Sequence, residues 1–361
     1  MLSISWFVGD KIVTSPAFME KLLSDGQLAE LRKVIDDARR VVCVCHVNPD
    51  GDALGSTLAL WHWMRSMGKE CSVVVPNCFP DFLAWMPGAS EIVRYDKHKE
   101  DAERLMGGAD LMWMCDLNCS KRVQEMEAAL LESPACKVMV DHHQDPEDIC
   151  NMVISEPQMC ATCEILCHVL YQMGVLQEAG LDMAVCLYTG MMTDTGAFTY
   201  NSNRPVIFEC ISHLLERGVD KDRIYRNVMW TATPARMRLI GYMLYVKMEV
   251  QKGLHTSLMT LTNAERRMLG VKNGDTEGVV NLPLQISGMR LSALLSEDTE
   301  HKNVVRISLR SVDDFPCNEM SARFFNGGGH LNAAGGRLEC SMDEAVKRFH
   351  EAVKFYEAML K

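Results

Sequence analysis

The sequence predicts an α/β protein of two domains, and three observations support this fold class. Strand-like and helix-like segments alternate through the first two-thirds of the chain, which is typical of a parallel sheet. From about Ala235 the pattern changes to longer strand-like runs. A length of 361 residues is enough for two hydrophobic cores. We expect a catalytic domain over residues 1–230, with its exit helices, and a smaller α/β domain over 235–361, with an active-site cleft between them.

The first domain is expected to open with a strand over Arg40–Cys45, a loop over Asp50–Ser56 and a helix over Thr57–Met67. Short apolar runs bounded by polar residues predict the other buried strands. These further strands are Cys71–Val75, Glu91–Tyr95, Leu111–Cys115 and Lys137–Val140. Helices are expected at Lys97–Met106, Lys121–Leu131, Thr162–Met173, Ala179–Met192, Val206–Arg217 and Asp222–Met229.

The second domain is expected to follow a boundary at Thr231-Ala232-Thr233-Pro234. Its predicted strands are His255–Leu261, Arg290–Leu295 and Val304–Arg310. Its predicted helices are Asn263–Leu269, Asn318–Phe325 and Met342–Leu360.

Composition is that of an ordinary globular protein, with 48% hydrophobic and 24% charged residues. No apolar run approaches the roughly 18–20 residues of a membrane helix. Met1–Ser15 lacks a basic start and is interrupted by Gly9-Asp10-Lys11, so it is a poor signal peptide. Most of the fifteen cysteines lie in apolar segments, which fits reduced thiols. We therefore expect a cytoplasmic protein that does not bind membranes.

Two further patterns bear on ligands. The spacing Cys160-x-x-Cys163-x-x-x-Cys167 could suggest a metal or iron–sulfur site, but the segment has helical apolar periodicity and lacks a fourth ligand. A core helix is the favoured interpretation. The net charge of −11 argues against tight binding to a long duplex, which depends on many phosphate contacts. A small anionic substrate is compatible with that charge.

Histidine and aspartate cluster at strand ends, and this is the strongest functional signal. The residues are His46, Asp50, Asp52, Asp116, Asp141, His142, His143 and Asp194. In a parallel sheet, ligands bind beyond the carboxyl ends of the strands. Imidazole and carboxylate ligands without thiolate suit manganese, magnesium or iron, and there are too many for one ion. Two ions sharing a carboxylate would suit phosphoester hydrolysis, with Gly51 allowing a tight turn between Asp50 and Asp52.

These residues resemble the motifs of the DHH phosphoesterase family, which includes RecJ exonucleases and the short NrnA-type oligoribonucleases and pAp phosphatases. His46-x-x-x-Asp50-x-Asp52 resembles the first motif, Asp116 the second, Asp141-His142-His143 the third and Asp194 the fourth. The glycine-rich segment ending at His330 resembles the signature of the DHH-associated C-terminal domain.

The resemblance implies roles for these residues. One metal would be held by His46, Asp50 and Asp116, and the second by Asp52, Asp116, His142 and Asp194, with Asp116 bridging. The ions would be manganese, with magnesium or iron as alternatives, and a metal-bridged hydroxide would attack phosphorus. His143 would contact phosphate. Asp141 would orient a neighbouring group, with a strand-end cap as the alternative.

The second domain is expected to bind the substrate. Gly327-Gly328-Gly329 before His330 suggests a loop whose amides face an anion, although three glycines could also form a plain turn. Arg310 and Ser311 resemble the family's arginine–serine substrate contact, since a guanidinium can grip phosphate at two points.

The expected activity is hydrolysis of short oligonucleotides to mononucleotides, of pAp to AMP, or of both. Alternatives are a phosphodiesterase for cyclic di-AMP and its linear product pApA, an exopolyphosphatase, and a catalytically silent nucleotide-binding regulator. The complete ligand set disfavours the regulator. The expected partner is a short nucleotide substrate rather than a long duplex, and a homodimer is plausible.

Overall fold

The computed structural model describes residues 19–272 and 274–361, which form two compact units. The first unit ends at Thr231 and the second begins at Ala232. The Met1–Ser15 segment, interpreted from sequence as a poor signal peptide, lies outside the described residues. None of the described helices combines the length and the apolar character needed to cross a bilayer.

The first unit is built on a six-stranded sheet in which every neighbouring pair is parallel, so the predicted parallel α/β domain is confirmed. The strand order is β3-β2-β1-β4-β5-β6, so the direction of winding reverses between β1 and β4. Ligands bind at such a reversal, beyond the carboxyl ends of the strands. The bounds are β1 Arg40–Val44, β2 Glu70–Val75, β3 Val93–Arg94, β4 Leu111–Cys115, β5 Cys136–Asp141 and β6 Met152–Ser155.

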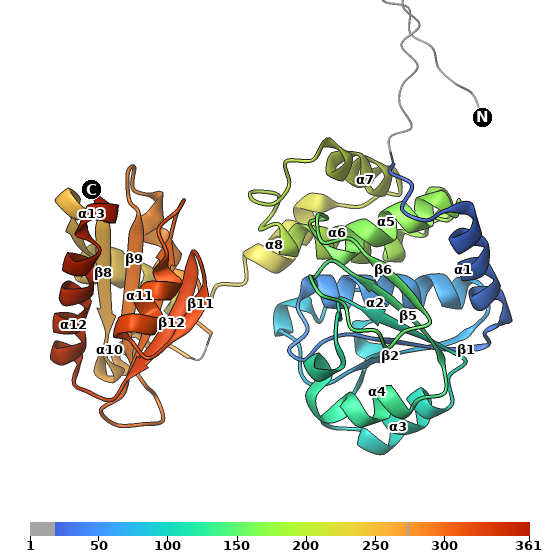
Figure 1. Ribbon diagram of the computed structural model, residues 1–361, viewed down its shortest axis with the longest axis horizontal. Helices are drawn as coiled ribbons and strands as arrows, with labels where there is room; N and C mark the ends of the chain where they lie inside the picture. Colours follow the sequence, from blue (N-terminus) through green and yellow to red (C-terminus); the bar gives the residue numbers. More distant parts are fainter. Residues whose placement is uncertain (1–18, 273) are drawn as a thin grey trace, which may run out of the picture. The chain divides into compact units, whose positions relative to one another are not determined.

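Helices cover both faces of this sheet (Figure 1). The α-helices are α1 Asp25–Asp37, α2 Gly51–Ser66, α3 Lys99–Gly107, α4 Glu127–Glu132, α5 Thr162–Gln172, α6 Leu181–Asp194, α7 Pro205–Glu216 and α8 Lys221–Met229. Short 3-10 helices are η1 Asp81–Leu83, η2 Ala89–Glu91, η3 Ser120–Met126 and η4 Leu176–Glu178. Alternate strand residues point to opposite faces. Cys43 and Trp113 therefore pack toward α2, α5 and α6, whereas Val44 and Met114 pack toward α3 and α4.

Several local predictions for the first unit were wrong. Asp50–Ser56 is not a loop, because α2 begins at Gly51 and the Asp50 side chain caps it. The expected helix Lys121–Leu131 is divided, because Gln124, with a φ of 49°, forms a kink inside η3 and α4 begins only at Glu127. The strand expected over Glu91–Tyr95 shortens to β3. Helix α1 and strand β6 had not been predicted.

The second unit contains a mixed six-stranded sheet of order β11-β12-β10-β9-β8-β7. Only β8 and β9 pair in parallel among the described strands of this unit. The strands are β7 Glu249–Gln251, β8 Thr256–Leu261, β9 Leu291–Glu297, β10 Val305–Ser311, β11 Gly328–His330 and β12 Ala333–Leu338. The helices are α9 Pro234–Tyr242, α10 Asn263–Leu269, α11 Cys317–Phe324, α12 Met342–Phe355, α13 Glu357–Leu360, the π-helix η5 Met243–Lys247, and the 3-10 helices η6 Lys252–Leu254 and η7 Val279–Gln285.

The two faces of the second sheet differ in what covers them. Helices α11 and α12 bury one face, where Ile307 and Leu309 pack in the same core as Phe349. On the opposite face, α9 and η7 cover β8 and β9 through a smaller core that includes Met259 and Leu294. Alternation along β10 turns its arginines, Arg306 and Arg310, away from α11 and α12.

The glycine-rich segment is not the predicted loop. Gly328–His330 forms β11, which pairs antiparallel with β12. A Cβ on Gly327 would lie 1.9 Å from the carbonyl oxygen of Gly335. Gly329 has a φ of 144°, and a Cβ there would lie 2.4 Å from the Ala333 oxygen. These two glycines are therefore explained by the close approach of the hairpin strands.

Candidate metal centre

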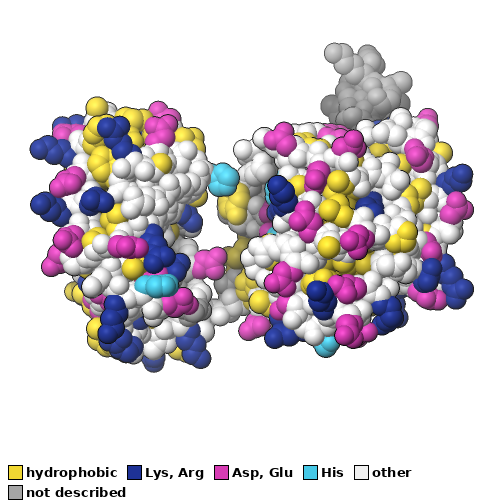
Figure 2. Space-filling view, turned by 60° about the horizontal axis from the view of Figure 1, so that its bottom comes forward, with side chains coloured by type: hydrophobic (Ala, Val, Ile, Leu, Met, Phe, Trp, Pro, Cys, Tyr) yellow, Lys and Arg dark blue, Asp and Glu magenta, His cyan; other side chains and the backbone are white. Residues whose placement is uncertain are grey.

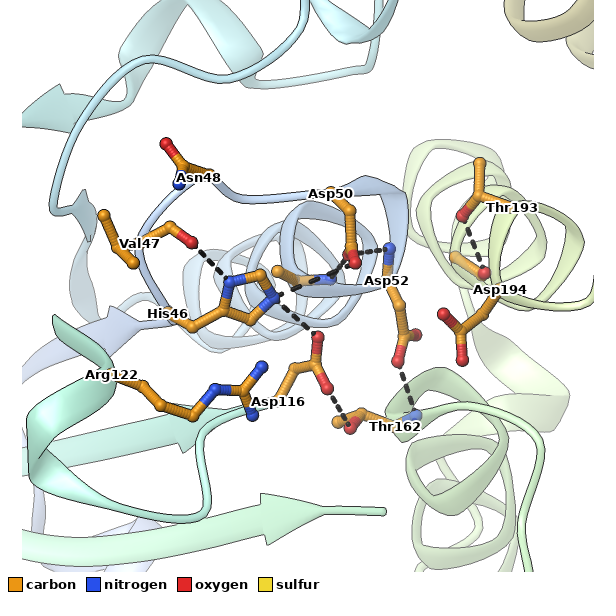
Figure 3. Close-up of polar contacts among 12 residues, drawn as sticks. His46, Val47, Asn48, Asp50, Asp52, Asp116, Arg122, Thr162, Thr193 and Asp194 are labelled. Carbon is orange, nitrogen blue, oxygen red and sulfur yellow. Dashed lines mark hydrogen bonds and ion pairs between the residues drawn. The ribbon is translucent and has the colours of Figure 1, made fainter. Parts of the chain in front are cut away.

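A cluster of histidine and aspartate side chains lies at the carboxyl edge of the first sheet, next to the winding reversal (Figure 3). Strands β1, β4 and β5 lead into it, while the start of α2 and the end of α6 complete it. Three groups of three residues place one ligand atom each within 4.8 Å of the others. They are His46 with Asp50 and Asp116, Asp52 with His142 and Asp194, and Asp116 with His142 and His143.

Asp116 occupies the middle of the cluster. It is 2% exposed and follows β4 with a φ of 53°, a left-handed conformation that aspartate tolerates better than most residues. Its Oδ2 lies 3.1 Å from Nε2 of His46, and its Oδ1 lies 3.5 Å from Nε2 of His142. Because each oxygen faces a different histidine, this carboxylate is arranged to bridge two cations.

Both of these histidines have a backbone partner on the far side of the ring. Nδ1 of His46 lies 2.8 Å from the Val47 carbonyl, and Nδ1 of His142 lies 3.3 Å from the Met159 carbonyl. A carbonyl can only accept, so each Nδ1 donates to it, and each Nε2 is the ring nitrogen that faces the cluster. This is the orientation of a metal-ligating histidine with its supporting hydrogen bond.

The spacing of the donor atoms fits divalent ions. Octahedral ligands at about 2.1 Å from an ion are about 3.0 Å from their neighbours. The distance from His46 Nε2 to Asp116 Oδ2 is 3.1 Å, and that from His142 Nε2 to Asp194 Oδ2 is 3.5 Å. Small inward movements would bring both pairs onto common ions. The residues present therefore fit a site for divalent cations.

Asp50 and Asp52 each perform a structural task as well. Oδ1 of Asp50 accepts from the amides of Asp52 and Ala53 at 3.0 Å, leaving Oδ2 directed toward His46 at 3.9 Å. Asp52 is fully buried and accepts from the amides of Thr162 and Cys163, at 2.6 and 3.0 Å, where α5 begins. A carboxylate oxygen can accept more than one bond, so these contacts orient both groups while leaving them able to bind metal.

Close packing of α2 against α6 brings Asp52 and Asp194 together. A Cβ on Gly51 would lie 2.3 Å from Oγ1 of Thr193, and one on Gly55 would lie 2.6 Å from the carbonyl oxygen of Cys186. Gly51 does not have a positive φ. Its expected role in a tight turn is therefore wrong, and its lack of a side chain serves helix packing instead.

His143 differs from the other histidines in its hydrogen bonding. Its Nδ1 lies 2.8 Å from Oδ1 of the fully buried Asp141 and 3.3 Å from Oδ1 of Asp116. With two carboxylates facing it, this nitrogen acts as a donor, so we do not assign it as a ligand despite its place in one of the three groups. The His143 side chain remains 37% exposed. Asp141 therefore positions His143, whose Nε2 is left for another partner.

The electrostatics of the cluster reflect crowded carboxylates. Burial and the charges of Asp116, Asp194 and Asp50 raise the pKa of Asp52 well above its usual range. Burial opposes ionisation of Asp116, yet the hydrogen bond from His46 and the nearby histidines lower its pKa. Burial alone would lower the pKa of His46, but its contact with Asp116 raises it. Bound cations would relieve the repulsion among these carboxylates.

The chain matches two known domain families and a solved structure. The model of the DHH family N-terminal domain matches residues 40–191, and the model of the DHHA1 domain matches residues 261–358. A crystal structure of an exopolyphosphatase-related protein from Bacteroides fragilis is 45% identical, with a TM-score of 0.86, covering 95% of this chain and 99% of that one. The chain belongs to the DHH family.

Two curated relatives of DHH type also match. The bifunctional oligoribonuclease and PAP phosphatase NrnA of Thermus thermophilus is 26% identical over 340 residues, covering 94% of this chain and 95% of that protein. The cyclic-di-AMP phosphodiesterase GdpP of Geobacillus thermodenitrificans is 24% identical over 345 residues. That match covers 90% of this chain but 49% of GdpP, so this chain spans about half of that protein.

The DHH domain also places an arginine, Arg122, beside the cluster, and the sequence analysis did not identify it. Arg122 lies on η3, and its side chain extends toward Asp116 (Figure 3). Its carbonyl accepts from the amide of Val47 at 2.8 Å, which ties η3 to the segment after His46. Arg122 Nη1 donates to Asn118 at 3.4 Å. The only signal in the sequence was its closeness to Asp116, because its approach depends on how η3 folds back.

In the DHHA1 domain the predicted substrate residues divide into two kinds. Arg310 and His330 both pair with Ala333, so they share one row across β10, β12 and β11 and one face of the sheet. His330 is exposed and Arg310 is half-buried. Ser311 is different, because its buried hydroxyl donates to the Phe315 carbonyl at 2.8 Å and accepts from Asn332 at 2.9 Å. These two hydrogen bonds within the domain engage the Ser311 hydroxyl in the fold rather than present it to a substrate.

Proposed function

We propose that this DHH-family protein is a metal-dependent phosphoesterase that hydrolyses short oligonucleotides to mononucleotides, pAp to AMP, or both. The observation that carries the proposal is Asp116, whose two oxygens face the Nε2 atoms of two different histidines at 3.1 and 3.5 Å. The match to NrnA of Thermus thermophilus along almost the whole of both chains supports this substrate class.

The proposed centre holds two divalent ions, manganese before magnesium or iron. His46, Asp50 and Asp116 would bind one ion, and Asp52, Asp116, His142 and Asp194 the other. Such a pair activates water for attack on phosphorus and neutralises charge on the phosphate. Hydrogen bonds that the α5 amides donate to Asp52, and those that His46 and His142 donate to main-chain carbonyls, keep the ligands oriented.

The remaining side chains are proposed to act on the phosphate. His143 would present Nε2 to a phosphate oxygen, while Asp141 holds its Nδ1 at 2.8 Å. The hydrogen bond that His143 donates to Asp141 is the main cause that raises the pKa of His143, which favours the protonated, donating form. Arg122 would add a second positive group beside the same centre.

Substrate binding is assigned to the second unit. Arg310 and His330 would hold a terminal phosphate or nucleotide end from the shared sheet face. Gly328 adds an exposed strand position where no atom lies within 4 Å of a built Cβ, so backbone can be approached there. Gly327, Gly329 and Ser311 are retained in the proposal only as supports for this surface.

The charge distribution favours a small substrate. On the face shown in Figure 2, acidic and basic side chains are interspersed over both units. A mixed surface supplies little of the clustered positive charge that a long duplex requires. A cytoplasmic location, in keeping with fifteen free cysteines, and a homodimer complete the proposal.

Exopolyphosphatase activity is a second candidate, because the Bacteroides fragilis protein that is 45% identical is described as exopolyphosphatase-related. Cleavage of cyclic di-AMP is a third, because GdpP matches this chain over about half of its own length. Both would use the same metal centre and differ in what the second unit binds. A catalytically silent regulator is disfavoured by the complete set of ligand residues.

The deciding experiment is product analysis with manganese on a panel of substrates. The panel contains RNAs two to five nucleotides long, a long single strand, pAp, cyclic di-AMP and polyphosphate. Stepwise release of mononucleotides from the short RNAs, with the long strand spared, is the expected result. Preference for polyphosphate or cyclic di-AMP would replace the substrate assignment. No turnover of any compound would contradict the proposed enzyme.

A further inference from the structure

The segment that follows Asp194 has an unusual backbone. Gly196, Ala197 and Phe198 have φ values of 53°, 57° and 63°, so three consecutive residues lie in the left-handed region. For alanine and phenylalanine this conformation is unfavourable, and it persists only where the surrounding structure holds it. Strain of this kind concentrates at binding and catalytic sites.

Several contacts hold this turn in place. The amide of Ala197 donates to the Met192 carbonyl at 2.7 Å, and the amide of Phe198 donates to Oγ1 of Thr195 at 3.0 Å. The Phe198 ring packs edge-on against Tyr188, at a centroid distance of 5.7 Å. The turn is therefore fixed directly to α6, the helix that ends in Asp194.

The result of the turn is the placement of Tyr200. Its ring lies against Gly196, where a built Cβ would come within 2.2 Å of Cε1. Gly196 therefore provides both the φ value and the space that this ring requires. Tyr200 is nevertheless 59% exposed, so much of the ring remains open to solvent. Partial burial and the nearby charge of Asp194 both raise the pKa of the phenol, in keeping with its closeness to the cluster.

We propose that Tyr200 is a stacking surface for the nucleobase next to the scissile phosphate. The proposal rests on the function proposed above and adds a specificity determinant to it. An aromatic ring beside a centre that cleaves phosphoesters suits a nucleotide, in which a single sugar separates the flat base from the phosphate. Base–aromatic stacking is tolerant of sequence, because every base has a π-face. Tyr200 would thus favour nucleotides over polyphosphate, which has no base.

The test compares the dinucleotide pApA with the same compound lacking both bases, using manganese and the full chain. In the Tyr200→Ala variant, the ratio of kcat/KM for pApA to that for the abasic compound is expected to fall about tenfold, mainly through KM. Tyr200→Phe is expected to keep the wild-type ratio, since the ring remains. Leu131→Ala, an exposed apolar residue on α4 near the amino edge of the sheet, is the matched control.

A direct reading of stacking comes from 2-aminopurine riboside 5′-monophosphate. Its fluorescence should be quenched on binding to wild type and to Tyr200→Phe, and much less by Tyr200→Ala. An equal loss on pApA and on the abasic compound would overturn the proposal, because Tyr200 would then support the metal centre. An unchanged ratio in Tyr200→Ala would also overturn it. Failure of wild type to cleave pApA would instead reject the oligonucleotide activity of the proposed function, and the stacking role with it.

Discussion

The cluster of histidine and aspartate side chains in the first unit and the Arg310–His330 face of the second unit are built in opposite ways. The cluster gathers side chains from β1, β4, β5, α2 and α6, and hydrogen bonds with the backbone orient His46, His142, Asp50 and Asp52. The Arg310–His330 face is one row across three strands, with Ala333 between the two side chains. A centre that performs chemistry needs donor atoms at set distances. A surface that binds the terminal phosphate or nucleotide of a substrate needs only charge and accessible backbone. Substitutions should therefore affect the two regions differently.

The largest expected effect is on the cluster. Asp116→Asn keeps the shape of the side chain but removes the charge shared by both proposed ions. We expect kcat to fall by at least about a thousandfold, since changes to supporting residues alone cost 10–100-fold. Steady-state hydrolysis of a short RNA with manganese measures the loss.

Asp101→Asn serves as the control for that loss, because Asp101 is an exposed aspartate on α3 that pairs with Arg104. The melting temperature of metal-free Asp116→Asn is expected to fall, because the contacts with His46 and the nearby histidines that lower the pKa of Asp116 stabilise the folded state at neutral pH. Activity of Asp116→Asn equal to wild type would remove the metal assignment altogether.

A smaller effect is expected for Asp141, which contacts His143. Asp141→Asn should lower kcat by roughly 10–100-fold, as for other groups that support an active-site residue. The hydrogen bond and charge of Asp141 raise the pKa of His143, so their loss should move the basic limb of the pH–rate profile to lower pH. A drop in rate without that displacement would mean that Asp141 only caps the end of β5.

Substitutions on the Arg310–His330 face are expected to change KM more than kcat. Arg310→Ala should raise KM about tenfold with little change in kcat, because one charge-assisted phosphate contact is lost. Arg323→Ala is the matched control, since Arg323 lies on α11 over the other face of the sheet and stacks on Phe355. If Arg310→Ala lowered kcat as Asp116→Asn does, the contrast between the two regions would not hold.

The smallest expected effect is that of pH on metal affinity. Burial raises the pKa of Asp194 to about 6, with Asp116 and Asp50 adding to the shift and His142 opposing it. Below that pH a proton competes with the cation, so manganese affinity should fall roughly fourfold between pH 7 and 5.5. Titration calorimetry at both values measures this.

The same raised pKa has a consequence for the metal-free protein. The folded state holds a proton that the unfolded chain would release, so stability is greatest below the ordinary aspartate range and declines as pH rises through about 6. Metal-free melting temperatures that rise over this interval would contradict the assigned shift.

The sequence predicted elements best where local signals agree with packing. Helix α10 was predicted with its observed bounds, Asn263–Leu269, and in the structure Thr262 and Glu265 form a capping box at its start. The start of α2 was missed because Asp50 was interpreted as a ligand alone, although its two oxygens allow it to cap the helix and face His46. Helix α9 was missed because Thr233-Pro234 was taken as a boundary, whereas Thr233 caps it.

The cluster could be anticipated because parallel strands deliver their carboxyl ends to one edge. What could not be anticipated depends on tertiary contact. Arg122 approaches Asp116 only because η3 folds back along Val47. Gly327-Gly328-Gly329 was predicted as a loop facing an anion, whereas Gly328 and Gly329 belong to β11, and Gly327 and Gly329 permit a close approach to β12.

The partners of His46 and His142 are main-chain carbonyls, those of Val47 and Met159. A carbonyl is present whatever side chain occupies a position. Amino-acid replacement at residues 47 and 159 therefore leaves the protonation pattern of both imidazoles in place, as long as the local backbone keeps its path. In a saturation mutagenesis experiment, these two sites would tolerate exchange among side chains of similar size, although each supplies the acceptor of a hydrogen bond on which the proposed metal binding depends. At these two positions the main-chain carbonyl matters to the centre, whereas the identity of the side chain does not.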